Sequence, residues 1–358
     1  TVNAGGTVTD SGTLTITGAT TINASNHNVE LNEAASNFGG AVSITGKNVA
    51  VTDANTIELG TSTVTGTYAV TATAGNITNS GVLTITGAAT FTAANGQSIY
   101  LDSANIFSNT VTFSSGGTLA NVTIKNTATF DLLALTLSGN LIVTSTGGSI
   151  TDSGALAISG TSSFTTSTSG QTIKLDITTN AFTGAVTLNT TGLTGNAEVD
   201  GGTTKLNIAT STVGGELKLT SGNAADAFGI IDSGTVTVGG NLIVTNDVSN
   251  GDINMGSLAV DGTIALVTSG SGGDVTVVND AGLNFATSTI GGDLIATATS
   301  GNISDYRTLT VTGATNIYLG TNPILTVSGA TSATDIWGNT IILNISVFTG
   351  GITLHYDN

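Results

Sequence analysis

The stretch GTVTDSGTLTITG, residues 6–18, decides the fold, because it returns along the whole chain. Its copies are GNITNSGVLTITG at 75–87, GSITDSGALAISG at 148–160, GIIDSGTVTVGG at 229–240 and an altered form, GNISDYRTLTVTG, at 301–313. The shared acidic or amide position falls at Asp10, Asn79, Asp152, Asp232 and Asp305. These positions recur about every 74 residues, and a fixed period of this kind indicates a repeat architecture.

Two further phrases recur between these copies. NFGGAVSI at 37–44 is echoed at 105–113, 180–188 and 347–354, and IELGTSTVTG at 57–66 is echoed at 206–215, 283–292 and, loosely, 130–139. Each unit therefore contains three sub-repeats of about 24 residues. The predicted units are 1–73, 74–146, 147–226, 227–299 and 300–358, approximately, within one uninterrupted solenoid.

Within each phrase, apolar residues alternate with Thr, as in Leu14-Thr15-Ile16-Thr17. A period of two, with many β-branched residues, is typical of a strand with one face in a core. Asp or Asn followed by Ser-Gly predicts a corner, since Asx side chains bond nearby backbone and Gly allows positive φ. A three-strand repeat of this length predicts a single right-handed parallel β-helix, with roughly 15 rungs of about 24 residues and three rungs per unit.

The composition excludes several classes of protein. Of the 358 residues only 8% are charged, Lys+Arg number 6 against Asp+Glu 23, the net charge is −17, and there is no Cys. A chain with so few cations cannot neutralise a phosphate backbone, so no nucleic-acid partner is expected. The absence of Cys excludes disulfide scaffolds and thiolate metal sites. No apolar run approaches the length of a membrane helix, and the opening residues do not read as a signal peptide.

The three phrases together resemble the repeat region of large bacterial exoproteins of the filamentous haemagglutinin type, which use two-partner secretion. The resemblance covers nearly the whole chain and implies a repeat shaft. It implies a protein that is secreted, exposed at the bacterial surface and adhesive.

The acidic residues are the natural candidates for chemistry. A position reused in every unit and replaceable by Asn, as Asp10, Asn79, Asp152, Asp232 and Asp305 are, is expected to be a structural corner. No catalytic residue and no cofactor is therefore predicted. Ca²⁺ stays open, because Asn250-Gly251-Asp252 and Gly272-Gly273-Asp274 are loop-like, although no known calcium-loop pattern is present.

Aromatic residues gather in the last fifth of the chain, at Tyr306, Tyr318, Trp337, Phe348 and Tyr356. They are expected to form a bulkier core or end cap, or a contact surface for a protein or glycan. The first rung begins in mid-phrase, so the ends are expected to stack on neighbouring copies or on further parts of a longer chain.

The sequence thus predicts a non-enzymatic, secreted structural protein, an adhesin-like shaft or fibre-forming subunit. A β-helical carbohydrate-active enzyme of the tailspike or pectinase kind is the alternative, and needs carboxylates on adjacent rungs of one face. An ice-binding solenoid is a third reading, based on outward pairs such as Thr15 and Thr17.

Overall fold

The computed structural model describes residues 1–223, 228–305 and 307–318, and beyond them the backbone of Leu319 and of five short strands. All regular structure in these residues is β-strand. Among them no helix is long and apolar enough to cross a membrane. The chain divides into two compact units, Thr1–Ser167 and Thr168–Asn358.

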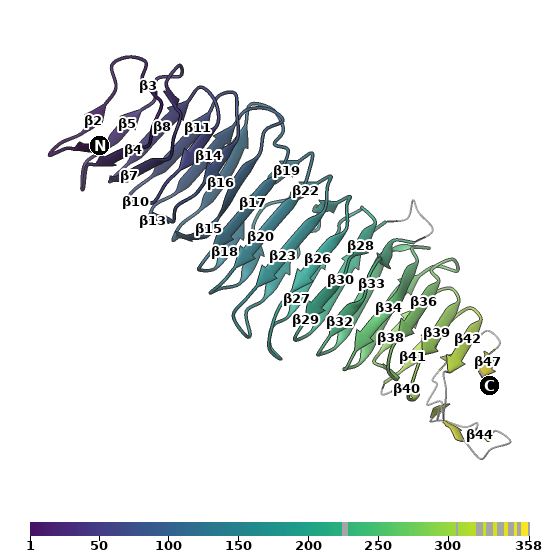
Figure 1. The fold of residues 1–358 in the computed structure, drawn as a ribbon. Coiled ribbons are helices and arrows are strands. Elements are labelled where there is room, and N and C mark those ends of the chain that lie inside the picture. Colours follow the sequence, from purple (N-terminus) through teal and green to yellow (C-terminus); the bar gives the residue numbers. More distant parts are fainter. Residues whose placement is uncertain are drawn as a thin grey trace. The chain divides into compact units, whose positions relative to one another are not determined.

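The first unit is a stack of parallel strands (Figure 1). One sheet contains β1 (Val2–Asn3), β4 (Thr20–Asn23), β7 (Val42–Gly46), β9 (Ile57–Leu59), β10 (Ser62–Val64), β12 (Ile77–Asn79), β13 (Leu83–Ile85), β15 (Ile99–Phe107), β17 (Val122–Asn126), β20 (Leu141–Ser145) and β23 (Ser162–Thr166). A second contains β2 (Val8–Thr9), β5 (Val29–Leu31), β8 (Val49–Asp53), β11 (Tyr68–Ala72), β14 (Ala89–Ala93) and β16 (Val111–Ser115). Three short pairs complete it: β3 (Thr15–Ile16) with β6 (Asn37–Phe38), β18 (Phe130–Leu132) with β21 (Ile150–Asp152), and β19 (Leu135–Leu137) with β22 (Leu156–Ile158).

The second unit repeats this arrangement. One set of parallel strands is β26 (Val186–Asn189), β28 (Leu206–Ile208), β29 (Ser211–Val213), β31 (Ile230–Asp232), β32 (Val236–Val238), β34 (Ile253–Val260), β36 (Val275–Asn279), β39 (Leu294–Ala298), β42 (Thr315–Leu319) and β47 (Ile352–Tyr356). The other is β24 (Ile173–Leu175), β27 (Ala197–Asp200), β30 (Leu217–Ser221), β33 (Leu242–Ser249), β35 (Ile264–Ser269), β37 (Leu283–Phe285), β38 (Ser288–Ile290), β40 (Ile303–Asp305), β41 (Leu309–Val311), β43 (Leu325–Thr326) and β46 (Val347–Phe348). The remaining strands are β25 (Ala181–Phe182) and the antiparallel pair β44 (Ser332–Thr334) and β45 (Thr340–Ile342).

The strand register confirms the predicted parallel β-solenoid and shortens its turn. Val8 pairs with Val29, Val29 with Val49, and Val49 with Tyr68. The spacing is about 21 residues rather than the expected 24, and the chain forms about 15 turns, as predicted. The right-handed coiling and the single uninterrupted solenoid remain predictions.

The shorter turn has a local cause. Most turns consist of one straight strand and one bent segment, and the decisive phrase is a bent segment. Its two short strands, such as β12 and β13, both pair with the single long strand β15. The three predicted strands of a rung are therefore one straight strand and the two arms of a bend.

A unit of about 74 residues at about 21 residues per turn spans about three and a half turns, not three. Successive copies of the decisive phrase must then alternate between sheets. In the first unit, Asp10 follows β2 of one sheet and Asn79 ends β12 of the other. In the second unit, Asp232 ends β31 and Asp305 ends β40, again in different sheets.

The core is a set of apolar columns along the stack. Inward positions of most described strands are buried, as in the column Ile57, Ile77, Ile99 and Val122. Close-packed aliphatic stacking of this kind supplies the main stabilising free energy, about 25 cal/mol per Å² of apolar surface. Outward positions carry Thr, Ser and Asn, so the local alternation in the sequence sets the radial layering of each turn.

Candidate functional site

Side chains at the corners hydrogen-bond from one turn to the next, and we call this set the corner ladder. Each member directly precedes a strand, and its Oδ1 accepts the backbone N–H of the residue at the same place one turn later. With the accepting side chain named first and the donating backbone N–H second, the pairs are Asn48 and Thr67, Asn76 and Ser98, Asn121 and Asn140, Asn140 and Thr161, Asn196 and Glu216, Asn241 and Thr263, Asp252 and Asp274, Asp274 and Asp293, and Asp293 and Ala314, at 2.7–3.0 Å. Each bond gives an acceptor to a backbone N–H at a corner that has no partner in the strand pairing.

Most members of the corner ladder have their Oδ1 close to a glycine of the following turn. A Cβ at Gly139 would meet Oδ1 of Asn121, and a Cβ at Gly292 would meet Oδ1 of Asp274. The side chain of one turn thus occupies the volume that a larger residue would need in the next. Sequence reasoning missed this ladder, although Gly-Asn or Gly-Asp directly before an apolar strand, at one-turn spacing, is a readable signal.

Buried amides form a second kind of turn-to-turn contact. Oδ1 of Asn126 accepts the N–H of Phe107 at 2.9 Å, while its Nδ2 donates to carbonyls of the same region. Asn279 makes the same contacts with Val260. Both side chains are fully buried, so their hydrogen bonds are structural requirements.

The residues predicted as corners contact the neighbouring turn. The carboxylate of Asp10 accepts the backbone N–H groups of residues 32 and 33, each at 3.3 Å. The carboxylate of Asp232 accepts those of residues 256 and 257, at 2.9 and 2.7 Å. The partners of these two carboxylates lie in the next turn, whereas the side chain of Asn79 also bonds the carbonyl of Gly81, two residues on in the same corner.

The other three corner residues differ in detail. Asn79 is buried, and its Nδ2 donates to the carbonyl of Gly81 and to Oδ1 of Asn105. Asp152 is buried at the end of β21, and Asp305 is half-buried at the end of β40. The structure therefore does not gather the five predicted corner residues into one site.

The predicted aromatic surface falls mostly outside the described residues. Tyr306 and Trp337 are not described, and of Phe348 and Tyr356 only the backbone strands β46 and β47 are described. Tyr318, in β42, is 36% exposed.

The two loops considered for Ca²⁺ lie on adjacent turns. Oδ1 of Asp252 accepts the N–H of Asp274, so that oxygen already has a partner. Burial raises the pKa of the Asp252 carboxyl; the hydrogen bond from Asp274 opposes this rise and repulsion from the Asp274 carboxylate adds to it. Among the described residues, no group of three or more His, Asp or Glu is placed to hold a metal ion.

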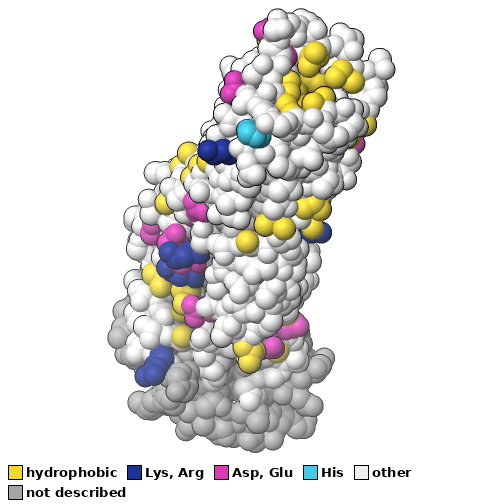
Figure 2. Space-filling view, turned by 90° about the vertical axis from the view of Figure 1, so that its left-hand side faces the viewer, with side chains coloured by type: hydrophobic (Ala, Val, Ile, Leu, Met, Phe, Trp, Pro, Cys, Tyr) yellow, Lys and Arg dark blue, Asp and Glu magenta, His cyan; other side chains and the backbone are white. Residues whose placement is uncertain are grey.

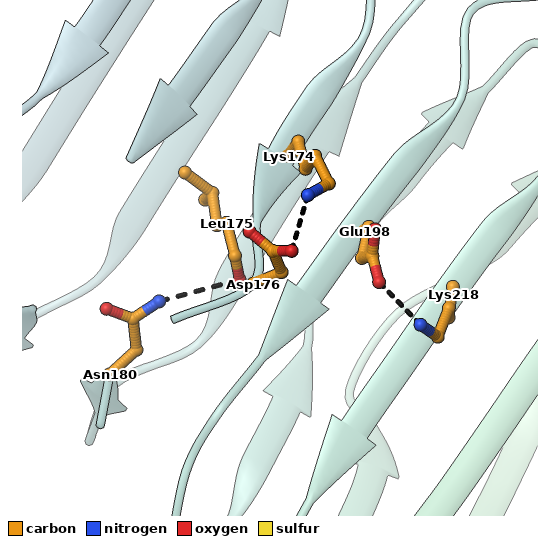
Figure 3. A network of polar contacts seen from close by, with 6 residues as sticks. All are labelled: Lys174, Leu175, Asp176, Asn180, Glu198 and Lys218. Atoms are coloured by element: carbon orange, nitrogen blue, oxygen red, sulfur yellow. Dashed lines mark hydrogen bonds and ion pairs between the residues drawn. The ribbon is translucent and has the colours of Figure 1, made fainter. Parts of the chain in front are cut away.

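A cluster of charged side chains lies in the second unit, and we call it the charged ladder: Lys174, Asp176, Glu198 and Lys218 (Figure 3). Strand register aligns Lys174 with Glu198, and Glu198 with Lys218, on the strands β24, β27 and β30. Nζ of Lys174 lies 2.5 Å from Asp176, and Nζ of Lys218 lies 2.6 Å from Glu198. Each of these two carboxylates is thus already neutralised by an ammonium group.

Asp200 lies next to the charged ladder, at the end of β27. Burial raises the pKa of its carboxyl, the N–H of Gly202 opposes this rise, repulsion from Asp247 adds to it, and Lys218 lowers it. The hydrogen bond that the Lys218 ammonium donates to the Glu198 carboxylate is the main reason that the pKa of Lys218 is raised. Around Asp200 the two lysines of the charged ladder form partly exposed ion pairs, and exposed pairs of this kind contribute little to stability.

A cleft of about 320 Å³ in the first unit is lined by Phe107, Asn109, Phe130 and Asp131, among others. Its one carboxylate, Asp131, accepts hydroxyl hydrogen bonds from Thr151 at 2.9 Å and Ser153 at 2.5 Å. Glycoside hydrolysis of the usual kind needs two carboxyl groups across the scissile bond.

Comparison with known proteins places the chain in one family. A family described as repeats of unknown function (DUF5649) matches residues 1–45, 46–114, 119–189 and 272–325. These matches cover more than half of the chain, which therefore belongs to this family of repeats. No curated protein and no solved structure matches the chain.

Proposed function

We propose that this protein is a structural shaft: a non-enzymatic, secreted repeat segment at the bacterial surface that holds or forms an adhesive fibre. One observation carries the proposal. Polar side chains at the corners bind the next turn, as the corner ladder shows: Asn121, Asn140, Asp274 and Asp293 each accept a backbone N–H one turn later.

The surface supports the same proposal. Figure 2 shows few charged side chains on a face that is mostly uncharged, with one group in which basic and acidic side chains meet. In the charged ladder, where charges do meet, Glu198 and Asp176 are each paired with a lysine. A face of Thr, Ser and Asn keeps a long stack soluble without creating a strong field toward a charged ligand.

The location is tested on intact cells that make the protein. An antibody against residues 1–358 should label the cell surface in electron micrographs, and protease added to intact cells should remove the label. Labelling that requires permeabilised cells would overturn the proposed location. The absence of catalysis is tested separately. The purified chain is incubated with polysaccharides and should release no reducing ends.

A further inference from the structure

The exposed face of the first turn is built like the interior of the stack. Leu14, directly before β3, and Ile16, in β3, are half-exposed, whereas their counterparts Leu83 and Ile85 are fully buried. Leu14 and Ile16 line an apolar hollow of about 270 Å³ together with Val2, Val8, Ile22 and Phe38. In Figure 2, apolar side chains lie open at the upper end of the molecule.

The same type of turn precedes every interior copy of the decisive phrase. The copy at 75–87 pairs with 57–64, and the copy at 148–160 pairs with 130–137. The copy at 229–240 pairs with 206–213, and the copy at 301–313 pairs with 283–290. All four neighbours are phrases of the IELGTSTVTG type, and only the copy at 6–18 has no such neighbour among the described residues.

The glycines of the phrase show what that neighbour requires. A Cβ at Gly81 would meet the backbone nitrogen of Thr61, and a Cβ at Gly154 would meet that of Ala134. Both backbone atoms belong to the preceding phrase. Gly12 holds the same place in the first turn, yet nothing lies within 4 Å of its Cβ position. The first turn thus has the close-approach glycine without the backbone that needs it.

We propose that the first turn is an acceptor surface for one partner: a further repeat unit of this family that ends in a turn of the IELGTSTVTG type. The inference names the partner of the shaft, and so rests on the proposed function. Its contacts would continue those already present between turns, with backbone pairing along β2 and β3 and apolar side chains filling the hollow.

The test supplies this partner from the chain itself. Residues 54–68, which contain the phrase at 57–66, are fused directly before Thr1 of the full chain. The fusion should raise the thermal unfolding midpoint and slow amide exchange at Ile16 by at least about tenfold. A control fusion with Ile57, Leu59 and Val64 of the added segment changed to Asp should do neither.

Gly12→Val makes the test specific to the proposed contact. It should leave the unfolding midpoint of the unfused chain unchanged, because its surroundings are open, but remove the gain produced by the fusion. Gly116→Val, at an equally open glycine inside the stack, should change the unfolding midpoint of neither the unfused chain nor the fusion. No gain from the fusion, or a gain that Gly12→Val leaves intact, would overturn the proposal.

Sedimentation of the unfused chain distinguishes the partner. The unfused chain and its Gly12→Val variant should have the same association state. If the unfused chain self-associates and Gly12→Val prevents this, the occupant is a second copy and the proposal is wrong. None of these results depends on where the cell places the protein, so surface labelling tests the proposed function separately.

Discussion

Oδ1 of Asn121 lies 2.8 Å from the backbone nitrogen of Asn140, one turn later in the first unit, and Asn140 in turn accepts the N–H of Thr161 at 2.9 Å. A side chain and a backbone group from consecutive turns therefore form a chain of hydrogen bonds along the stack. The position accepts Asn or Asp, since Asp274 makes the same bond to Asp293 in the second unit. The requirement is an acceptor oxygen on a short side chain, not a charge.

Asn140→Ala should destabilise the protein by about 1 kcal/mol, because the N–H of Thr161 loses its protein acceptor. Asn140→Asp should be close to the wild type, since it keeps that acceptor. Urea denaturation measures the difference, and amide exchange at Thr161 localises it. Equal losses in both variants would show that the hydrogen bond is not the cause.

Gly160→Ala should cost more, about 1–3 kcal/mol, because its Cβ would overlap Oδ1 of Asn140 and the backbone of Gly139. Gly116→Ala is the matched control, since its Cβ would meet nothing within 4 Å. The control should be neutral or slightly stabilising through the reduced entropy of the unfolded chain. The two variants are compared in the same urea titration, and equal stability would contradict the close approach of neighbouring turns.

The period of the sequence was sufficient to predict a parallel solenoid, but not the number of turns in a unit. Alternation of apolar residues and Thr identifies strands such as Thr15–Ile16 and Leu83–Ile85. It cannot show that the Ser-Gly between β12 and β13 only bends a segment within one sheet. Without that information, the sequence predicts three strands in each turn and three turns in each unit, and so misses the additional half-turn.

The candidate sites were less predictable, for two physical reasons. Contacts between turns join residues about 21 positions apart, so the partner of Asp10 depends on loop lengths that the phrase does not specify. Buried amides such as Asn126 look like ordinary strand ends in the sequence VTIKN. Only the register, which places Asn126 beside the N–H of Phe107, shows that the side chain points inward.

Asn126→Ala should therefore cost more than Asn140→Ala, about 2–3 kcal/mol, although both remove an asparagine. The variant removes the acceptor of the buried N–H of Phe107 and the amide donor to the carbonyl of the same residue, and water cannot easily replace the lost amide. Asn126→Ser should be intermediate, since Ser145 occupies the paired position one turn later. Urea denaturation compares the three, and a smaller loss for Asn126→Ala than for Asn140→Ala would contradict the assigned role.

The last prediction concerns pH and Asp252, whose carboxyl has a pKa raised chiefly by burial. The folded protein then binds this proton more tightly than the unfolded chain does. The contribution of Asp252 to the free energy of unfolding is therefore greatest below the ordinary pKa of a carboxyl, and decreases as the pH rises through the raised value. Near neutral pH the ionised form of Asp252 is a net cost to the folded state.

Asp252→Asn removes that cost and keeps the oxygen that accepts the N–H of Asp274. At pH 7 the variant should have a higher thermal unfolding midpoint than the wild type, and the difference should shrink as the pH is lowered below about 4. Asp102→Asn, at an exposed position of β15 in the first unit, controls for the loss of one charge from a chain of net charge −17. A variant less stable than the wild type at pH 7, or a difference that grows on acidification, would show that the turn is stabilised by the charge of Asp252 and not only by its oxygen.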